Sequence, residues 1–587
     1  MSFKKDTFYG WKGGTDKEIY FFFYLPEWEK IDKLSKELNC SHIIANLLLQ
    51  RGVDTAEEAH AFFNPTLNML HDPFLMKDMD KAVLRLEKAI STEEKVMIYG
   101  DYDVDGTTAV ALLYKYLKNK CEYPEYYIPD RYTEGYGVSI LAIDYAARNG
   151  ISLMIVTDCG VKAVEKVRYA KSKGVDVIIC DHHTPGDELP DAVAVLDPQR
   201  KDCHYPYRWL SGCGVSFKLA QAYSMKHNLP MADLYKLLDL VCVSIASDIV
   251  PITGENRILA HFGLLQLNRK PRLGLKTILS FSGIGKDLTI NDIVFRIGPK
   301  INAAGRVESG NKSVELLIAD DETRATEVAA SINNFNDQRK KLDHDITEEA
   351  LEYINQSHYD QSQKATVLYN PNWHKGVIGI VASRLTEYYY RPTVILTESN
   401  GLATGSARSV EGFDLYYAIS QCSEFLENYG GHKYAAGLTL RLENIEPFKA
   451  KFQKIVSETI TEEMLTPQIN IDAQIKLNDI TPDLYAMIQK FAPFGPNNTI
   501  PVFMTENVTN FIGSKQVGRN NEHLKLVVVD DTRVCNDRSG IAFGMGEAFS
   551  RISKGEYFDI CYTLQENEFM GKSDIQMMIR DLKFKEE

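Results

Sequence analysis

Short apolar runs alternate with amphipathic stretches through the middle of the chain, from about residue 95 to residue 196. The apolar runs predict β-strands at Val96–Tyr99, Tyr126–Pro129, Leu153–Thr157, Val175–Cys180 and Ala192–Leu196. Apolar residues at helical spacing between them predict helices near Thr107–Leu117, Ser139–Ala147 and Val161–Lys173. This alternation indicates a mostly parallel sheet with right-handed crossovers, and ligands of such sheets bind beyond the carboxyl ends of the strands.

The flanking regions follow other patterns. Residues 1–90 predict an N-terminal helical cap, and residues 91–265 hold the sheet and the helices that follow it. Residues 266–360, which end in a long polar stretch with helical spacing, predict a helical connector. A second α/β lobe is expected at 361–462, and short strands after Pro467 predict a closed sheet of the OB type at 463–587. The expected fold class is α/β: a parallel-sheet lobe and a second α/β lobe joined by a long helix, then an OB-type β-barrel.

Composition narrows the class of protein without identifying a function. The 587 residues are 44% hydrophobic and 25% charged, as in folded soluble proteins. Residues 1–16 lack the pattern of a signal peptide, and the apolar run Ile19–Leu25 is too short to span a bilayer. The ten cysteines include no C-x-x-C pair, which favours reduced thiols in a cytoplasmic protein. A net charge of −14 argues against a general nucleic-acid coat protein, but it allows a nuclease with one basic groove.

The most informative segment is Tyr99-Gly-Asp-Tyr-Asp-Val-Asp-Gly106, which directly follows the first predicted strand of the sheet. Its three carboxylates, on Asp101, Asp103 and Asp105, repel one another unless a cation lies among them. Taken alone, this turn also fits a solvated acidic loop or a calcium loop. The EF-hand version fails, because Leu112 stands where that loop needs Glu at its twelfth position.

Three further polar motifs also lie in or after apolar runs. Asp158 ends the third predicted strand, Asp181-His182-His183 follow the fourth, and Asp248 lies among Ile245, Ala246, Ile249 and Val250. Singly, each has an ordinary explanation: a helix N-cap, a capping turn with a surface histidine, or an acid at a helix end. Together they supply the oxygen and imidazole ligands of a two-metal phosphoesterase centre. An imidazole in the ligand set shifts the preference from Mg²⁺ towards Mn²⁺.

Several glycine-rich and basic segments are candidates for phosphate binding. Arg296-Ile-Gly-Pro-Lys-Ile-Asn-Ala-Ala-Gly-Arg306 and Gly405-Ser-Ala-Arg-Ser409 combine arginine with small residues that let backbone N–H groups approach a phosphate, although both also fit tight turns. His432 in Gly430-Gly-His432 also fits a structural turn, and Arg131 is a weaker candidate at the edge of the site. The segment Ser211–Phe217 resembles a dinucleotide loop faintly, but it precedes no βαβ unit and is set aside.

In this order, the motifs resemble those of the DHH phosphoesterase superfamily, and within it those of the single-stranded-DNA-specific exonucleases. The resemblance is carried by Tyr99–Gly106, Thr157-Asp-Cys-Gly160, Asp181-His-His183, Ser244-Ile-Ala-Ser-Asp248, Ile301-Asn-Ala-Ala-Gly-Arg306, Gly430-Gly-His-Lys-Tyr-Ala-Ala-Gly437 and Phe494-Gly-Pro-Asn497. It runs from about Ile43 to Lys583 and implies a DHH lobe, a helical connector, a DHHA1 lobe and an OB domain. One departure is Cys159, where the family more often has Asn.

The resemblance also implies roles for individual residues. Two divalent ions, Mn²⁺ or Mg²⁺ with Mn²⁺ favoured, would be bound by Asp103, Asp105, Asp158, His182 and Asp248. Asp101 and His183 would support these ligands or contact phosphate, so that Asp101, Asp158 and His183 form the catalytic set. The backbone and 5′ end of the substrate would be held by Arg131, Asn302, Arg306, Ser406, Arg408 and His432.

The sequence therefore predicts a 5′→3′ exonuclease that degrades single-stranded DNA by two-metal hydrolysis in recombination and repair. The expected protein is a cytoplasmic monomer without membrane contact, with single-strand-binding protein and a RecQ-type helicase as candidate partners. A phosphodiesterase for cyclic dinucleotides or short oligonucleotides is the alternative, but it would not require the N-terminal cap or the OB domain. A non-catalytic DNA-binding scaffold is the other alternative, and the five intact ligand positions argue against it.

Overall fold

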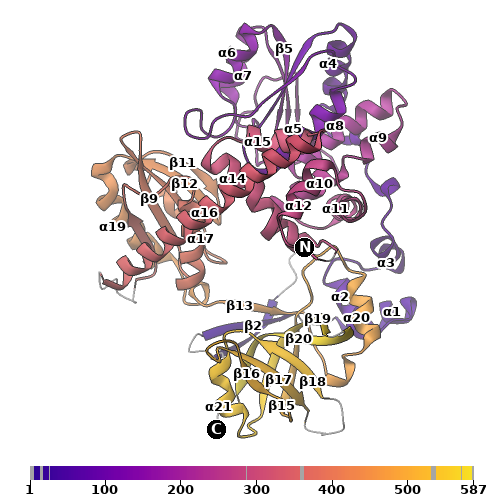
Figure 1. The fold of residues 1–587 in the computed structure, drawn as a ribbon, viewed down its shortest axis with the longest axis vertical. Coiled ribbons are helices and arrows are strands. Elements are labelled where there is room, and N and C mark those ends of the chain that lie inside the picture. Colours follow the sequence, from indigo (N-terminus) through magenta and orange to yellow (C-terminus); the bar gives the residue numbers. More distant parts are fainter. Residues whose placement is uncertain are drawn as a thin grey trace. The chain divides into compact units, whose positions relative to one another are not determined.

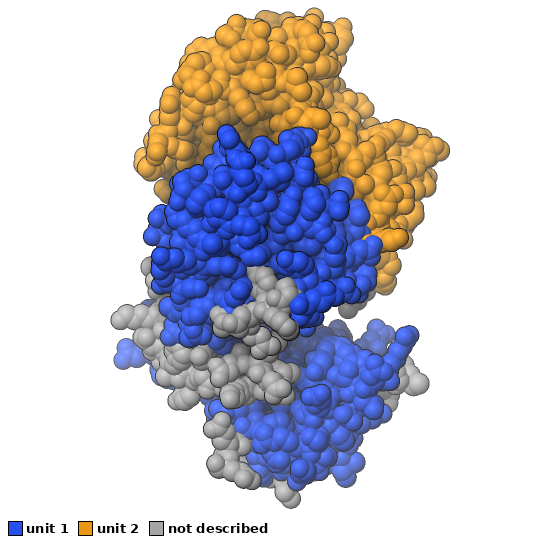
Figure 2. Space-filling view, turned by 90° about the vertical axis from the view of Figure 1, so that its left-hand side faces the viewer, with its two compact units in different colours: residues 1–64, 342–492, 500–587 blue, residues 65–341, 493–499 orange. Residues whose placement is uncertain are grey.

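The structure is a computed structural model that describes residues 5–12, 18–24, 27–285, 287–356, 363–530, 537–569 and 571–584. The chain divides into two compact units, coloured separately in Figure 2. Unit 1 comprises residues 1–64, 342–492 and 500–587, and unit 2 comprises residues 65–341 and 493–499. Each unit is described by itself below.

Unit 2 is built around a five-stranded sheet in which all strands are parallel (Figure 1). The strands are β3 (Lys95–Gly100), β4 (Pro124–Tyr127), β5 (Ile151–Thr157), β6 (Asp176–Cys180) and β7 (Ala194–Leu196). This confirms the parallel sheet predicted from the sequence. The spatial order is β4-β3-β5-β6-β7, so the direction of winding reverses between β3 and β5. Ligands of doubly wound sheets bind at such a switch point.

Both faces of this sheet are buried, because alternate strand residues enter two different cores. Ile98, Ile155 and Ile178 face one core, which is shared with α4 (Met79–Ser91), α5 (Val104–Leu117) and α8 (Gly212–Lys226). Tyr99, Val156 and Ile179 face the other core, which is shared with α6 (Ile140–Arg148) and α7 (Val164–Ser172). Strands buried on both faces appear in the sequence as continuous apolar runs, which is why they could be found there.

The rest of unit 2 is helical. After α8 come α9 (Met231–Tyr235), α10 (Leu238–Ser247), α11 (Gly254–Arg269), α12 (Leu273–Ser280), α13 (Ile290–Asp292), the π-helical turn η3 (Ile293–Ile297), α14 (Gly298–Val307), α15 (Asn311–Ile318) and the first part of α16 (Glu322–Gln356). The segment Arg296–Arg306, a candidate for phosphate binding, is helical rather than a tight turn. The backbone N–H groups within a helix are occupied by intrahelical hydrogen bonds, so the phosphate contacts expected of this segment would have to come from its side chains.

Unit 1 contains a second five-stranded sheet, with the order β11-β12-β10-β9-β8. Its elements are β8 (Thr366–Tyr369), α17 (Ile378–Tyr389), β9 (Thr393–Ser399), β10 (Leu402–Arg408), α18 (Leu415–Ser420), β11 (Leu426–His432), β12 (Ala435–Leu440) and α19 (Ile445–Thr459). The backbone of Gly405–Ser409 does not form the phosphate nest that was expected there. Residues up to Arg408 form β10, whose backbone pairs with β9 and β12 on both sides.

The C-terminal strands of unit 1 form a closed barrel. They are β14 (Ala473–Gln474), β15 (Phe503–Asn510), β16 (Lys515–Val517), β17 (His523–Val529), β18 (Arg538–Ala542), β19 (Phe558–Phe569) and β20 (Lys572–Phe584). The order β15-β19-β20-β18-β17 closes through pairing of β17 with β15. The predicted OB-type barrel is therefore confirmed, and α20 (Pro482–Gln489) and α21 (Phe549–Ile552) accompany it.

The N-terminal region is not helical throughout, which corrects the helical cap expected at residues 1–90. The region does contain helices, as the prediction implied: α1 (Trp28–Leu38), α2 (His42–Leu49) and α3 (Ala56–Phe63). Before them, however, β1 (Lys5–Lys12) and β2 (Glu18–Tyr24) form a hairpin, and β2 pairs with β13 (Gln468–Ile471). The apolar run Ile19–Leu25 was considered only as a membrane span, and the pairing of β2 with the distant β13 leaves no signal in the local sequence. None of the helices within the described residues combines the length and apolar character needed to cross a membrane.

Candidate metal centre

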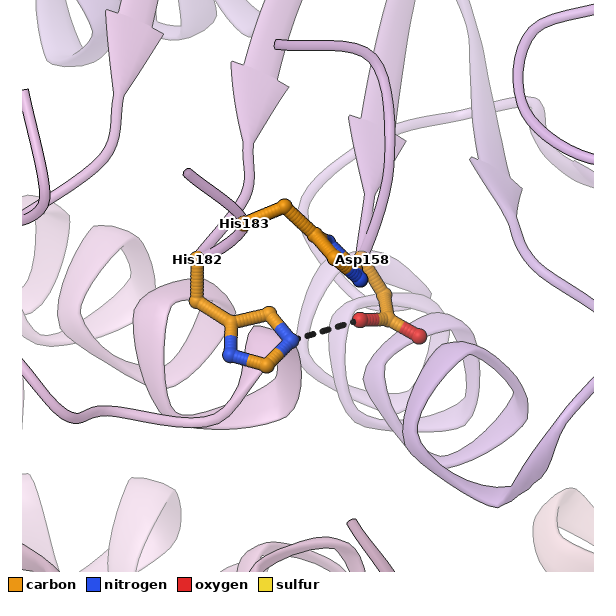
Figure 3. A group of neighbouring side chains, drawn as sticks. All are labelled: Asp158, His182 and His183. Carbon is orange, nitrogen blue, oxygen red and sulfur yellow. Dashed lines mark ion pairs between the residues drawn. The ribbon is translucent and has the colours of Figure 1, made fainter. Parts of the chain in front are cut away.

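The carboxyl ends of β3, β5 and β6 bring acidic and imidazole side chains together at the switch point of the sheet in unit 2. Nε2 of His182 lies 3.2 Å from Oδ1 of Asp158 and 3.6 Å from Oδ2 of both Asp105 and Asp248. Figure 3 shows the Asp158 carboxylate reaching the His182 ring, with His183 beside them. Four separate segments of the chain therefore meet around one imidazole nitrogen.

The candidate ligand atoms form three overlapping groups. Each group has its atoms within 4.8 Å of one another: Asp101 with Asp103 and Asp158, Asp105 with His182 and Asp248, and Asp158 with His182 and His183. Asp158 and His182 each belong to two of the three groups, so these two residues link the groups to one another. Every predicted metal ligand is thus brought into one cluster.

Burial makes this cluster unfavourable without a compensating cation. The pKa values of Asp101, Asp103, Asp158 and Asp248 are all raised, first by burial and then by the charges of neighbouring carboxylates. Burial lowers the pKa of His182, so its imidazole is available in the neutral form that ligates metals. Within the described residues, Oδ1 of Asp101 is buried without a hydrogen-bond partner, and none of the carboxylates around Nε2 of His182 is in hydrogen-bonding geometry with it. Carboxylate oxygens with one imidazole fit a divalent cation such as Mn²⁺.

Asp105 is oriented by the N-terminus of α8. The backbone N–H groups of Gly212 and Cys213 donate to its two oxygens over 2.7 and 2.8 Å, and the Ser244 hydroxyl donates to Oδ1 over 2.6 Å. An anion at a helix N-terminus is stabilised by free N–H groups and by the helix dipole. The segment Ser211–Phe217, set aside in the sequence, thus binds a side chain of this protein rather than a dinucleotide.

The D-x-D-x-D turn is fixed by the helix that follows it. Helix α5 begins at Val104, three residues earlier than expected, and Asp103 is its N-cap through a hydrogen bond from the Gly106 N–H. Asn302 also supports the turn, because its Oδ1 accepts the N–H of Val104 over 3.1 Å. Asn302 was expected to bind substrate, and this contact gives it a positioning role as well.

His183 is held by Asp181 and faces Tyr136. Its Nδ1 lies 2.7 Å from Oδ1 of Asp181, and its Nε2 lies 3.2 Å from the Tyr136 hydroxyl. Burial lowers the pKa of His183, but the hydrogen bond and charge of Asp181 outweigh burial and raise it to about 9. At neutral pH His183 is therefore an imidazolium beside the carboxylate cluster.

Arg131 and Arg306 both lie near Tyr102 of the D-x-D-x-D turn. The Arg131 guanidinium is 4.9 Å from the centre of the Tyr102 ring, and the Tyr132 hydroxyl donates to the carbonyl of Arg306. Burial and Asp101 raise the pKa of Tyr102 to about 12, although both arginines act to lower it. Two cations therefore lie close to the acidic turn, where a phosphate group would approach.

The other predicted substrate residues lie in unit 1, on one face of its sheet. Arg408 and His432 both pair with Ala435 of β12, so their side chains point to the same face, as does that of Ser406 two residues before Arg408. The positions across the sheet from Ser406 are Gly437 of β12 and Gly430 of β11 on one side and Ile395 of β9 on the other. The second residue of α17, Gly379, comes close to Ser406 and Arg408. An arginine, a serine and a histidine therefore share one face of this sheet, and an added Cβ at Gly430 would meet nothing within 4 Å.

Sequence reasoning did not single out Tyr136, Asp197 or Gln199. Gln199 donates from Nε2 to the backbone carbonyl of His182 over 2.6 Å, and its own N–H donates to Oδ1 of Asp197. Asp197 follows β7 directly, so its place after an apolar run was a usable signal. Tyr136 lies in an irregular loop, and nothing in its local pattern indicated a contact with His183.

Comparison with known families agrees with this architecture. Residues 95–245 match the DHH family, N-terminal domain, residues 362–458 match the DHHA1 domain, and residues 471–581 match the RecJ OB domain. Fold and site together thus define a protein of the DHH class that carries a DHHA1 domain and an OB domain.

Individual relatives narrow this class. The chain is 38% identical to the single-stranded-DNA-specific exonuclease RecJ of Bacillus subtilis, over 95% of this chain and 70% of that protein. It is 30% identical to the protein of the same name from Escherichia coli, over 92% of this chain and 95% of the relative. The chain belongs to the RecJ family. The crystal structure of RecJ with Mn²⁺ from Thermus thermophilus has the same fold, with a TM-score of 0.83 and 24% identity over 97% of this chain and 80% of that one.

Proposed function

We propose that this chain is a metal-dependent exonuclease that degrades single-stranded DNA in the 5′→3′ direction, in DNA recombination and repair. One observation carries the proposal: acids from three segments converge on His182 at the switch point of the sheet, in a chain of the RecJ family. The relatives named single-stranded-DNA-specific exonuclease support the choice of substrate. A phosphodiesterase for cyclic dinucleotides remains the alternative, and no observation favours it.

The proposed cofactor is a pair of divalent ions, with Mn²⁺ preferred over Mg²⁺. Support comes from the mixed carboxylate and imidazole ligand set, and from a 30%-identical solved structure described as exonuclease RecJ bound to manganese. The ligands would be Asp103, Asp105, Asp158, His182 and Asp248. When bound, such ions lower the pKa of a water molecule and neutralise the charge that develops on the phosphate.

The protein's own residues position the reacting groups. Asp158, shared by two of the ligand groups, would bridge the two ion sites, and Asp101 would add a negative charge beside them. His183 keeps its proton on Nδ1 against Asp181, which leaves Nε2–H directed towards Tyr136 and towards the space beside the cluster. A charged N–H donor there would stabilise a phosphate oxygen more in the transition state than in the ground state.

Each unit contains residues that we propose as contacts for the strand. Arg131, Asn302 and Arg306 in unit 2, and Ser406, Arg408 and His432 in unit 1, are the proposed contacts for the substrate backbone and 5′ end. Arginine binds phosphate bidentately, and the open space beside Gly430 leaves room for a phosphate group. The OB-type barrel would bind the bases or the backbone downstream.

The division of the chain and its partners belong to the same proposal. We divide it into a cap at 1–90, a DHH domain at 91–265, a connector at 266–360, a DHHA1 domain at 361–462 and an OB-like domain at 463–587. We expect the protein to be a cytoplasmic monomer that works with single-strand-binding protein and a RecQ-type helicase. The nine cysteines within the described residues form no disulfide, which is consistent with a reducing compartment.

A nuclease assay on 5′- and 3′-labelled single and double strands, with and without Mn²⁺, tests the function. We expect nucleotides to be released from the 5′ end of single strands only, and only with the metal. Release from the 3′ end would contradict the polarity. Cleavage of a dinucleotide in preference to a long strand would favour the phosphodiesterase, and no cleavage with Mn²⁺ would favour the scaffold.

A further inference from the structure

Residues 493–499, called the 493–499 loop below, belong to unit 2 although the chain on both sides of them belongs to unit 1. The loop is braced internally. Gly495 and Asn498 exchange backbone hydrogen bonds of 3.0 Å, and Nδ2 of the buried Asn498 donates to the carbonyl of Pro493 over 2.9 Å. Asn497 has φ +61°, and a turn with proline second and asparagine at positive φ third has the features of type II. The loop is therefore a preformed, rigid element.

The loop is attached to the segment that follows a predicted metal ligand. The N–H of Ile252 donates to the carbonyl of Pro496 over 2.8 Å, and the Ile252 side chain is fully buried. Gly495 packs so closely on Ile252 that an added Cβ would lie against its Cγ1, nearer than real Cβ atoms approach. Only glycine fits at position 495 without moving Ile252.

Ile252 ends a short turn that begins at Asp248. Within it Ile249 has φ +57°, a left-handed conformation that is a true outlier for a β-branched residue, and its side chain is 62% exposed. Such strain persists only where the surroundings enforce it, and it is concentrated at functional sites. The Tyr207 hydroxyl and Nδ2 of Asn256 also both donate to the carbonyl of Pro251. The Asp248 turn is thus held by the 493–499 loop at Ile252 and by these two side chains at Pro251.

We propose that the 493–499 loop is a clamp that keeps the Asp248 turn in its strained conformation and so fixes the Asp248 carboxylate for metal binding. Gly495, Pro496 and Ile252 are positioning residues in this proposal, because none of them belongs to the carboxylate cluster. The inference rests on the proposed metal function of that cluster. The proposal gives a role to the Phe494-Gly-Pro-Asn497 motif, which contains none of the predicted metal ligands.

The test uses the full chain as wild type, as Gly495→Ala and as Gly285→Ala. Gly285 is an exposed glycine of the same unit with nothing within 4 Å of an added Cβ, so it is the matched control. Binding of Mn²⁺ is measured by calorimetry without DNA, and kcat and KM are measured on a single strand. Gly495→Ala should weaken Mn²⁺ binding by about 10-fold to 100-fold, the range for residues that support metal ligands, and lower kcat with little change in KM. Gly285→Ala should match the wild type.

Two further variants separate a clamp from a folding defect. Pro496→Gly loosens the turn without adding an atom, so it should weaken Mn²⁺ binding in the same direction but less. In Gly495→Ala/Ile252→Ala the colliding side chain is gone, so Mn²⁺ affinity should recover in part. Unchanged Mn²⁺ affinity in Gly495→Ala, or in Pro496→Gly if the first variant does not fold, would overturn the clamp. A rise in KM alone would do the same. Failure of the wild type to bind Mn²⁺ would instead overturn the proposed function.

Discussion

The backbone N–H of Gly212 donates to Oδ2 of Asp105 over 2.7 Å, although 107 residues separate them. The same glycine packs on Asp158: an added Cβ at position 212 would lie 2.7 Å from both Cβ and Oδ1 of that aspartate. Asp158 itself has φ +58°, an uncommon conformation for a residue with a side chain. One glycine at the start of α8 thus determines the positions of two carboxylates in the cluster.

Gly212→Ala should therefore damage the metal centre while leaving the fold intact. The added methyl group would displace Asp158, and we expect kcat to fall by about 10-fold or more with a matching loss of Mn²⁺ affinity. Gly214→Ala, in the same helix, is the control, because its Cβ would lie 3.3 Å from Oγ of Ser211 and would touch no ligand. Steady-state kinetics and Mn²⁺ titration of both variants make the comparison. Equal effects of the two changes would mean that only helix packing is disturbed.

Asp158→Ala should abolish cleavage and leave strand binding largely in place. The carboxylate belongs to two of the three ligand groups, whereas the proposed DNA contacts lie on other residues. Cleavage of a labelled single strand and its binding in the presence of EDTA are the two measurements. If both were lost together, the acid would have to be structural.

The five predicted ligands could be found in the sequence because each lies in or directly after an apolar run. Parallel strands bring their carboxyl ends to one edge, so acids after β3, β5 and β6 had to meet there. The sheet was predictable for the same reason, since strands buried on both faces leave long apolar runs.

What could not be predicted depends on contacts between distant segments. The hydrogen bonds of Gly212 to Asp105 and the pairing of β2 with β13 both join residues that are far apart in the chain. The small residues of Arg296–Arg306 and Gly405–Ser409 suggested backbone N–H groups open to a phosphate, or tight turns, but these segments form a helix and a strand. In β10, Gly405 and Ala407 are buried, and their small size lets neighbouring side chains pack against them.

Asp181→Asn should change stability in a defined pH window. Burial lowers the pKa of His183, but Asp181 raises it to about 9, above the ordinary value of 6.5. The pairing of the two side chains therefore stabilises the fold fully below pH 6.5, and this stabilisation is lost as the pH rises through 9. Burial raises the pKa of Asp181, but His183 and backbone N–H groups lower it to about 2, so the contribution is also lost as the pH falls from 3.8 through 2.

The free energy of unfolding, measured without divalent ions, should therefore differ most between wild type and Asp181→Asn from about pH 4 to pH 6.5. The difference should shrink as the pH rises towards 9. Asp191→Asn is a suitable control, because Asp191 is an exposed acid whose ion pair with Lys171 lies at the surface. A difference that stays constant over the whole range would contradict the pairing of Asp181 with a charged His183.

Asp197→Asn should stabilise the protein at alkaline pH. Asp197 is fully buried, and its Oδ2 has no hydrogen-bond partner among the described residues. Burial raises its pKa to about 8, so the carboxyl group is largely protonated at neutral pH. A folded pKa above the ordinary value means that wild-type stability falls as the pH rises from about 4 to 8. Asparagine has nearly the same shape and never ionises.

Asp197→Asn should consequently raise the free energy of unfolding only slightly near pH 4 and by about 1–3 kcal/mol near pH 8, the usual penalty for a buried group without a partner. Chemical denaturation at both pH values measures it. Oδ1 of the new side chain can still accept the Gln199 N–H, so the support of His182 by Gln199 should persist and kcat at pH 7 should stay close to that of the wild type. Loss of stability at pH 8 would show that the ionised carboxylate has a partner of its own in the folded protein.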